Sequence, residues 1–598
     1  MRVHQIVSAS LALLLAFPTF AQQQPPPRTY GETLEIRVVN VEVIVADRNG
    51  NPVTGLTKDD FEIFENGKRK DISNFLEINE PAQADARAAQ GTTGAAAAPA
   101  ASTERRHLLV FVDNTTLQPF NRNRVLAAMK GFVERTMRNG DEAMVVTWNP
   151  GLKEMQTMTT DRAQVLATLK AMSATTGQGS YLRVHREQTE NELRQMVRDY
   201  QMQPTMTNNT GVTSGSTGDT EGGPREPGSV ASRSARLNER PPYDRALGSV
   251  RNYAEAVMAD TRQKAEALRA LMAPFKGVQG RKVLIFVTES FSTQPARQMF
   301  EYLDSIKDGF DKGNFQNPRA EIMKYNDEPL FQTVTAMANA SGVTLYAVSA
   351  AGMAGGIDMP DASSIGMTVQ DRPVNKAPGK LAEQSLTELA AATGGLAVIG
   401  TNDFGAGFNK IAADLTMYYS LGYRADAPAT DVARKLDVKV KKPGVVVRNR
   451  ESFVQKATGT EIGETLAANL FAGVQKNDMN ITISAGVPAP KSDTEITVPV
   501  EVRIPVTSLT LLPEGTDVVG KFSIYSGFTR SDGMTFKMSK AQYPLRFAAD
   551  TLKDRRNVTV RIAMTLHKNT ESISVGVLDE TSNATGYATT KVTHESSK

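Results

Sequence analysis

The sequence predicts a chain of several domains. We expect an α/β doubly wound domain, inserted in or flanked by β-strands of an N-terminal β-sandwich, and a C-terminal all-β sandwich. Continuous apolar runs such as Leu108–Val112 alternate with helical stretches in the middle of the chain, which is typical of a parallel sheet covered on both faces. Patterns of period two flank this region on both sides. A length of 598 residues also exceeds what one hydrophobic core usually supports.

Residues 1–21 have the pattern of a secretory signal peptide. Arg2 is followed by an apolar stretch, Ile6 to Phe20, that is short for a bilayer crossing, and Ala21 offers a cleavage position before a polar Gln/Pro spacer. An uncleaved anchor is the alternative. The chain contains 0 cysteines, which excludes disulfides, thiolate metal sites and a cysteine nucleophile. We therefore expect an exported protein, periplasmic or secreted from a bacterial envelope, with no integral membrane segment after signal cleavage.

Residues 34–80 form the first predicted β segment. The segment LEIRVVNVEVIVAD has the alternation of a strand, with apolar positions at Val39, Val41, Val43 and Val45, and Asn66-Gly67 between two short strands is the signal of a tight hairpin. So few strands do not form an independent core. An Ala/Thr/Pro-rich linker, 81–104, separates them from the α/β region, and strands return at 417–453. We expect 34–80 and 417–453 to pair into one sandwich, with the α/β domain between them.

The α/β region spans 105–416. Its predicted strands end at or near Asp113, Trp148, Glu289 and Ala350, and helices lie between them. A polar, Gly/Ser/Thr-rich stretch near 205–240 is predicted to be a disordered insertion. After residue 470 the period returns to two, and seven strand-like segments in 470–598 are typical of a β-sandwich.

Composition argues against nucleic-acid binding. The formal net charge is +3, charged residues make up 22% of the chain, and no cluster of lysine and arginine occurs. The chain has 5 histidines, none near another in sequence, and no sequence motif of a hydrolase or nucleotide-binding loop.

Together, the strand HLLVFVD, the strand DEAMVVTW and FVTES in mid-chain resemble a von Willebrand factor A (vWA) domain. The segments NGNPVTGLTKDDFEIFENGK and YYSLGYRA, which flank that region, resemble the vWA-related secreted proteins of acidobacteria. The resemblance covers roughly Leu34 to Phe453. It implies a Mg²⁺ site at the carboxyl edge of the sheet, where hydroxyl and carboxylate oxygens hold the ion and one position stays open for a carboxylate from a protein partner.

Carried over residue by residue, the resemblance gives a degenerate metal site. Asp113 matches the first aspartate and Thr115 the first serine, whereas Leu117 stands where a second serine belongs. Ser180 matches a loop threonine loosely, and Glu289 replaces the last aspartate. We expect Mg²⁺ binding to be weak or absent, on the order of millimolar at best. In the competing interpretation, Asp113 has a structural role and accepts hydrogen bonds from loop amides at a helix N-terminus.

Two functions are compatible with these patterns. The first is a non-enzymatic protein–protein interaction or adhesion module that acts through the carboxyl edge of the parallel sheet. Its partner would be a protein whose identity the sequence does not reveal. The alternative is an envelope hydrolase whose active site is assembled from residues distant in sequence.

Overall fold

The computed structural model describes residues 38–80, 105–174, 181–201, 242–306, 317–352, 378–425, 430–473, 476–529, 536–551 and 555–593. The predicted signal peptide, the linker 81–104, Ser180 and the insertion near 205–240 lie outside the described residues.

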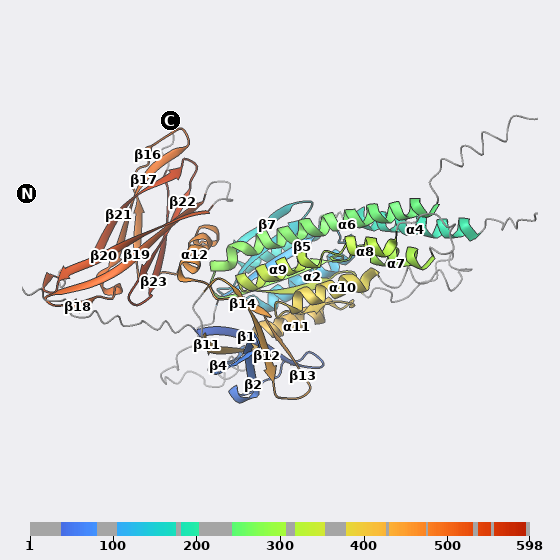
Figure 1. Cartoon of the computed structure of the whole chain (residues 1–598), viewed down its shortest axis with the longest axis horizontal. Helices are drawn as coiled ribbons and strands as arrows, with labels where there is room; N and C mark the ends of the chain where they lie inside the picture. Colours follow the sequence, from blue (N-terminus) through green and yellow to red (C-terminus); the bar gives the residue numbers. More distant parts are fainter. Residues whose placement is uncertain are drawn as a thin grey trace, which may run out of the picture. The chain divides into compact units, whose positions relative to one another are not determined.

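A six-stranded sheet is the centre of the α/β region (Figure 1). The strand order is β10-β9-β8-β5-β6-β7, and all neighbours pair in parallel except β7, which is antiparallel to β6. The strands are β5 (Arg106–Asp113), β6 (Glu142–Trp148), β7 (Leu152–Thr159), β8 (Arg281–Thr288), β9 (Val343–Ser349) and β10 (Ala397–Val398). The first of these strands in the sequence, β5, lies in the middle of the sheet, and the later strands lie on both sides of it. The predicted mixed α/β class with a parallel-containing sheet is confirmed.

Helices cover both faces of this sheet, which explains the continuous apolar strands (Figure 1). Alternate residues of β5 enter two different cores: Leu108 and Val110 pack with α2, α3 and α11, and Leu109 and Phe111 pack with α6, α9 and α10. The helices of this region are α2 (Pro119–Thr136), α3 (Arg162–Ser173), α4 (Tyr181–Gln201), α6 (Pro242–Met272), the 3₁₀ turn η2 (Ala273–Gly277), α7 (Arg297–Ile306), α8 (Pro318–Lys324), α9 (Glu328–Ser341), α10 (Pro378–Ala391) and α11 (Phe404–Thr416).

Local signals explain where several helices begin and end. Asp161 caps α3 by accepting hydrogen bonds from the backbone N–H groups of Ala163 and Gln164. Asp403 caps α11 in the same way. Gly342 ends α9 in the left-handed conformation, with φ of 68°, which a residue without a Cβ adopts at little cost.

Two four-stranded sheets form a small sandwich from the segments that flank the α/β domain. Their orders are β13-β1-β11-β4 and β14-β12-β2-β3. The strands are β1 (Val38–Asp47), β2 (Phe61–Glu65), β3 (Lys68–Lys70), β4 (Ile72–Asn79), β11 (Met417–Arg424), β12 (Ala433–Val440), β13 (Val445–Asn449) and β14 (Ser452–Val454). In both sheets, strands from 38–79 pair with strands from 417–454, so neither segment completes a sheet alone. These are the two segments that the period-two pattern predicts to pair.

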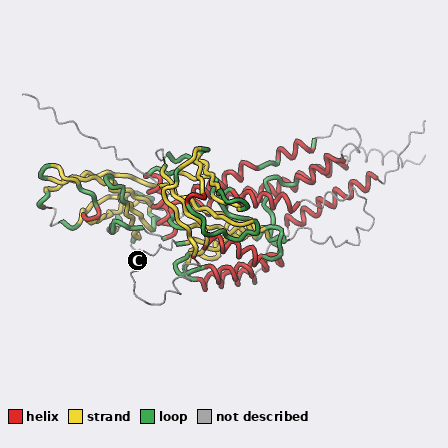
Figure 2. Tube along the Cα trace, turned by 90° about the horizontal axis from the view of Figure 1, so that it is seen from below, coloured by secondary structure: helices red, strands yellow, loops and turns green. Residues whose placement is uncertain are grey.

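The C-terminal residues form antiparallel sheets, so the predicted all-β character is confirmed (Figure 2). The strands are β15 (Thr482–Ala485), β16 (Ala489–Pro490), β17 (Glu495–Pro505), β18 (Leu512–Glu514), β19 (Asp517–Thr529), β20 (Phe536–Ala548), β21 (Asn557–His567), β22 (Ser572–Asp579) and β23 (Thr585–Lys591). One core, which contains Val500, Ile524 and Val575, joins the two sheets.

A helix that the sequence patterns did not predict precedes this sandwich. It is α12 (Thr458–Ala472), which ends at Gly473 in the left-handed conformation. Ala468 belongs to a core of the α/β domain, and Ile462 and Leu466 pack with aromatic residues of the C-terminal strands. The helix therefore buries two faces in two different cores, and such a helix lacks the single apolar stripe that marks an amphipathic helix.

Candidate functional site at the carboxyl edge of the sheet

The candidate site lies where β5 and β8 end. The two strands are parallel neighbours, with Val112 opposite Val287, so the residues that follow them meet at one edge. Asp113 is the last residue of β5, and Thr288 is the last residue of β8. Parallel α/β sheets bind ligands at this edge.

Hydroxyl groups surround the carboxylate of Asp113, which is 0% exposed. Its Oδ1 accepts hydrogen bonds from the N–H and the hydroxyl of Thr115, at 3.0 and 2.6 Å. Its Oδ2 accepts hydrogen bonds from the hydroxyls of Thr116 and Thr288, at 2.6 and 2.7 Å. A buried carboxylate is stable only when its oxygens are satisfied in this way.

The ammonium of Lys264 completes the site. Lys264 lies on α6 and is 0% exposed. Its Nζ is 2.7 Å from Asp113 Oδ2 and 2.5 Å from Oδ2 of Asp260, which lies one turn earlier on the same helix. The hydroxyl of Thr115 is 3.3 Å from the other oxygen of Asp260. One buried cation is therefore shared by two carboxylates from different elements.

The two carboxylates have different electrostatic surroundings. Burial by itself would raise the pKa of Asp113, but the charge of Lys264 and the hydrogen bonds outweigh burial and hold this pKa below its ordinary value. Burial raises the pKa of Asp260, because the charge of Lys264 does not fully offset it and Asp113 repels a second negative charge. Asp113 is thus the ionised partner of Lys264, and Asp260 holds its proton more tightly than an ordinary aspartate.

Glu289 makes a different set of contacts at the same edge. Its Oε1 accepts hydrogen bonds from the N–H of Gln118 at 2.8 Å and from the side-chain amide of Asn121 at 3.1 Å. Gln118 is the N-cap residue of α2, so Glu289 satisfies a free amide at a helix N-terminus. Burial, which outweighs these two bonds, and the charge of Asp113 raise the pKa of Glu289.

The structure brings only some of the expected ligands together. Asp113 and Thr115 are in contact, but Glu289 faces the start of α2, and Ser180 lies outside the described residues. Leu117 is 0% exposed and packs in the core with α2. In the competing interpretation, Asp113 accepts hydrogen bonds from loop amides at a helix N-terminus. The N–H of Thr115 does donate to Asp113. The amide at the start of α2 donates to Glu289 instead.

Lys264 and Asp260 were missed by sequence reasoning, although a signal for Lys264 exists. Buried residues recur along α6 with spacings of three and four: Ala254, Val257, Thr261, Lys264, Leu268 and Leu271. A lysine in such a stripe is almost never buried without a partner. The spacing of four from Asp260 to Lys264 supplies one partner, and the end of β5 supplies the other.

The residues present do not fit the Mg²⁺ ion that the vWA resemblance implies. A hard cation needs several oxygen ligands around it, yet an ammonium lies within hydrogen-bond distance of both carboxylates. One expected hydroxyl position is the buried apolar side chain of Leu117. Within the part of the chain that the structure describes, no group of three or more His, Cys, Asp or Glu residues is arranged to hold a metal.

The three histidines in the described ranges lie in separate places. His107 is near the start of β5, with Nδ1 3.0 Å from Glu142 and Nε2 2.9 Å from the carbonyl oxygen of Gln279. His185 packs against the ring of Tyr253, and His567 accepts a hydrogen bond within a turn. Each therefore has a local structural contact at its own position.

We expect Glu289→Gln to raise the melting temperature of the α/β domain at pH 7.5 and to have no such effect near pH 4. Because the folded-state pKa of Glu289 is raised above 4.5, its ionised form costs stability above that pKa, and the cost disappears as the pH falls below 4.5. Glutamine keeps the Oε1 acceptor without the charge. Calorimetry at the two pH values measures the difference.

Glu501→Gln is the matched control for this experiment. Hydrogen bonds from Arg503 and Arg561 lower the pKa of the partly buried Glu501, so removing its charge should slightly destabilise the protein at pH 7.5. An equal loss of stability for Glu289→Gln at both pH values would contradict the conclusion that the ionised form of Glu289 destabilises the folded protein.

No helix in the described ranges combines the length and hydrophobicity that crossing a membrane requires. In comparisons with known proteins, the sequence matches no protein-family model and no curated protein.

Proposed function

We propose that the chain is an exported, non-enzymatic binding protein of the vWA type, in which the ammonium of Lys264 takes the place of the metal ion. The resemblance supports this proposal through Asp113 and Thr115, which stand at the expected end of the first strand. The position of Lys264 against Asp113 supports the replacement. Export rests on the pattern of residues 1–21.

A built-in ammonium changes how a partner is recognised. A metal ion at this edge would leave a coordination position for a carboxylate of the partner. Lys264 is 0% exposed, and two carboxylates of the same chain contact its ammonium. The positive charge of Lys264 is therefore neutralised by carboxylates of its own domain. A partner must then bind side chains on the rim of the edge rather than the cation.

The observation that carries the proposal is an exposed aromatic residue on this rim. Phe120 lies in the first turn of α2, seven residues after Asp113 in the sequence, and is 73% exposed. The guanidinium of Arg124 lies 5.5 Å from the centre of its ring and is held by a 2.6 Å hydrogen bond to the carbonyl oxygen of Asn402. Aromatic residues and arginine are enriched at protein interfaces and among the residues that dominate binding energy.

The alternative function, an envelope hydrolase, has less support. A hydrolytic site needs a nucleophile or activated water within reach of a base. The described histidines are in three separate places, and the paired carboxylates Asp113 and Asp260 contact a buried ammonium. These contacts favour a structural role for the polar residues at the edge.

Site-specific photocrosslinking tests the proposal. We expect a photoreactive phenylalanine analogue at position 120 to crosslink a protein partner in the source cells. The same analogue at Leu512, which is 52% exposed in the C-terminal sandwich, should not crosslink that partner. Crosslinking should persist in EDTA, because the cation is part of the chain. Loss of crosslinking in EDTA with recovery in Mg²⁺ would contradict the replacement, and identical crosslinks from both positions would contradict the location.

The separate variant Phe120→Asp gives an independent measure of affinity. Removing a buried aromatic contact at the centre of an interface costs about 2 kcal/mol or more, which corresponds to a loss of roughly thirtyfold or more in affinity. The variant should keep the melting temperature of the wild type, because the ring is exposed in the free protein. Unchanged affinity for the crosslinked partner would exclude Phe120 as an anchor.

A further inference from the structure

A cavity lies at the opposite, amino edge of the parallel sheet. Its volume is about 910 Å³. It is lined by the first residues of β5 and β8, by the β1 and β11 strands of the small sandwich, and by α12. Arg106 and Arg281 contribute from the sheet, Glu42 and Tyr418 from the sandwich strands, and Asn469 from α12. Segments far apart in the sequence thus converge on one hollow.

Buried guanidinium groups in this lining have donors without acceptors. Arg106 is 2% exposed and Arg281 is 3% exposed. Among the described residues, four buried N–H nitrogens of the lining arginines make no hydrogen bond: Nη1 of Arg106, Nε and Nη2 of Arg281, and Nε of Arg450. A buried donor without an acceptor destabilises the folded state. The cavity is therefore rich in donors that a ligand can satisfy.

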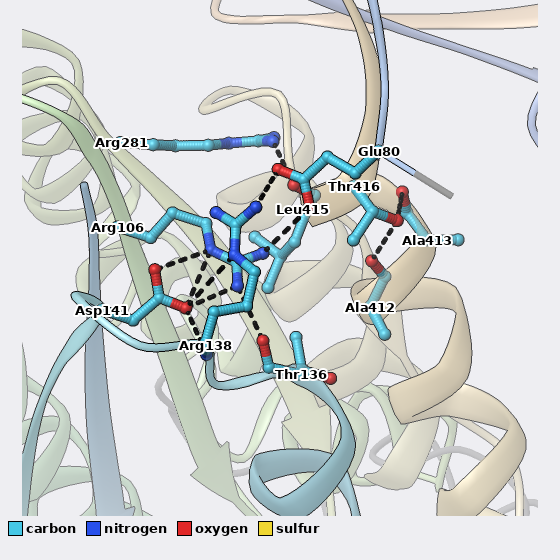
Figure 3. Close-up of polar contacts among 10 residues, drawn as sticks. All are labelled: Glu80, Arg106, Thr136, Arg138, Asp141, Arg281, Ala412, Ala413, Leu415 and Thr416. Atoms are coloured by element: carbon cyan, nitrogen blue, oxygen red, sulfur yellow. Dashed lines mark hydrogen bonds and ion pairs between the residues drawn. The ribbon is translucent and has the colours of Figure 1, made fainter. Parts of the chain in front are cut away.

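The arginines are held in place by contacts made with their other atoms. Arg281 donates from Nη1 to the carbonyl oxygen of Leu415 at 3.2 Å (Figure 3). Its guanidinium also lies 4.2 Å from the centre of the Tyr418 ring. Arg106 donates from Nε and Nη2 to Asp141, and Arg138 forms an ion pair with Glu80 (Figure 3). The unused N–H groups of Arg281 are thus positioned before any ligand binds.

The charge of the lining favours an anion. Three acidic residues line the cavity: Glu42, Glu80 and Asp478. The basic residues outnumber them: Arg105, Arg106, Arg138, Arg281, Lys282, Arg450 and Lys476. Of the acidic residues that the structure describes in the lining, only Glu42 forms an ion pair with Arg281, with Oε2 3.3 Å from Nε and without a hydrogen bond. Positive charge gathered in a concave site attracts anions more strongly than the same charge on an open surface.

We propose that this cavity binds a small multivalent oxyanion, whose carboxylate or phosphate oxygens accept hydrogen bonds from Arg281 and Arg450. A planar guanidinium with two free N–H groups on one side matches the spacing of two oxygens of either group. The proposal concerns the amino edge and stands independently of the protein-binding function proposed for the carboxyl edge.

Isothermal titration calorimetry with pyrophosphate and with citrate tests the proposal on the chain lacking the predicted signal peptide. At low ionic strength we expect saturable binding of at least one of the two, and the stronger of them identifies phosphate or carboxylate as the preferred group. Arg450→Gln and Arg281→Gln should each weaken that binding by about tenfold or more. Arg297→Gln, a change on the exposed surface of α7 outside the cavity, should leave it unchanged.

Glu42→Gln provides a test that does not depend on removing an arginine. The carboxylate of Glu42 competes with a ligand for Arg281, so its neutral isostere should tighten oxyanion binding severalfold. This variant distinguishes a ligand site from a misfolded protein, because a folding defect cannot increase affinity. The proposal is overturned if neither probe binds saturably, which would mean that water alone satisfies the arginines. It is also overturned if affinity is unchanged in both arginine variants or in Glu42→Gln.

Discussion

Replacing Lys264 with methionine should destabilise the α/β domain by about 3–5 kcal/mol, which is the usual cost of removing one partner from a buried ion pair. Methionine fills a similar volume, so the loss is electrostatic rather than a packing defect. Asp113 is 0% exposed and would keep its hydroxyl donors but lose the only cation that the structure places against it within the described residues. Denaturant unfolding monitored by the single tryptophan, Trp148 at the end of β6, measures the change.

A double-mutant cycle separates the pair from the individual residues. Asp113→Asn alone leaves the ammonium with Asp260, and we expect it to destabilise the domain as well. Combined with Lys264→Met, it should cost less than the sum of the two single changes, because the carboxylate of Asp113 is then no longer left against an apolar side chain. Lys324→Met, at a lysine that is 58% exposed, should change the unfolding free energy by no more than about 0.5 kcal/mol.

The same variants test whether Lys264 replaces the metal. Ligands that bind only the folded state raise its stability, so a functional Mg²⁺ site would make unfolding of the wild type depend on Mg²⁺. With the ammonium between the two carboxylates, Mg²⁺ should leave the wild-type melting temperature unchanged. A clear increase with Mg²⁺, lost in Asp113→Asn, would show that the cation displaces Lys264.

Local patterns in the sequence were sufficient to predict the sheet and its carboxyl edge. Leu108–Val112 is apolar throughout because both faces of β5 are covered, and Asp113 follows because this strand ends at a polar edge. The resemblance singled out Asp113 and Thr115, which are hydrogen-bonded to each other, but it considered only oxygen ligands. Lys264 is a nitrogen cation from a helix about 150 residues later, which no oxygen-ligand motif can indicate.

The amino-edge cavity could not be predicted, because its lining depends on distant segments. Arg281 is the first residue of β8, whose apolar run was recognisable in the sequence. Its neighbours Glu42 and Tyr418, however, come from the two sequence segments that form the small sandwich. Tyr418 and Tyr419 are adjacent residues of the same strand, β11. Adjacent side chains of a strand point to opposite faces, so Tyr419 is buried, whereas Tyr418 stacks with Arg281. Which tyrosine has which role depends on the pairing of β11, and the sequence does not encode that pairing locally.

Tyr419→Ala is expected to unfold the small sandwich, because Tyr419 belongs to its second sequence segment and packs against residues of the first. Its ring is 2% exposed and lies 5.0 Å from the ring of Phe61. Its hydroxyl donates to the carbonyl oxygen of Val53 at 2.9 Å and accepts from the N–H of Leu56 at 3.2 Å. Truncating a large buried aromatic side chain costs about 3–5 kcal/mol, and the unpaired amide of Leu56 adds about 1–3 kcal/mol. Few small sandwiches have stability to spare on that scale.

Hydrogen exchange distinguishes a shared sandwich from two independent segments. Strand β11 pairs with both β1 and β4, so in Tyr419→Ala the amides of 38–79 and 417–454 should lose protection together, while β19 and β22 keep theirs. Tyr419→Phe keeps the ring and removes only the hydroxyl, so it should cost about 1–3 kcal/mol and leave both segments folded. If 417–454 loses protection while 38–79 retains it, the first segment has a fold of its own. The strand pairing would then contribute little to its stability, and the α/β domain would not need to sit between two halves of one sandwich.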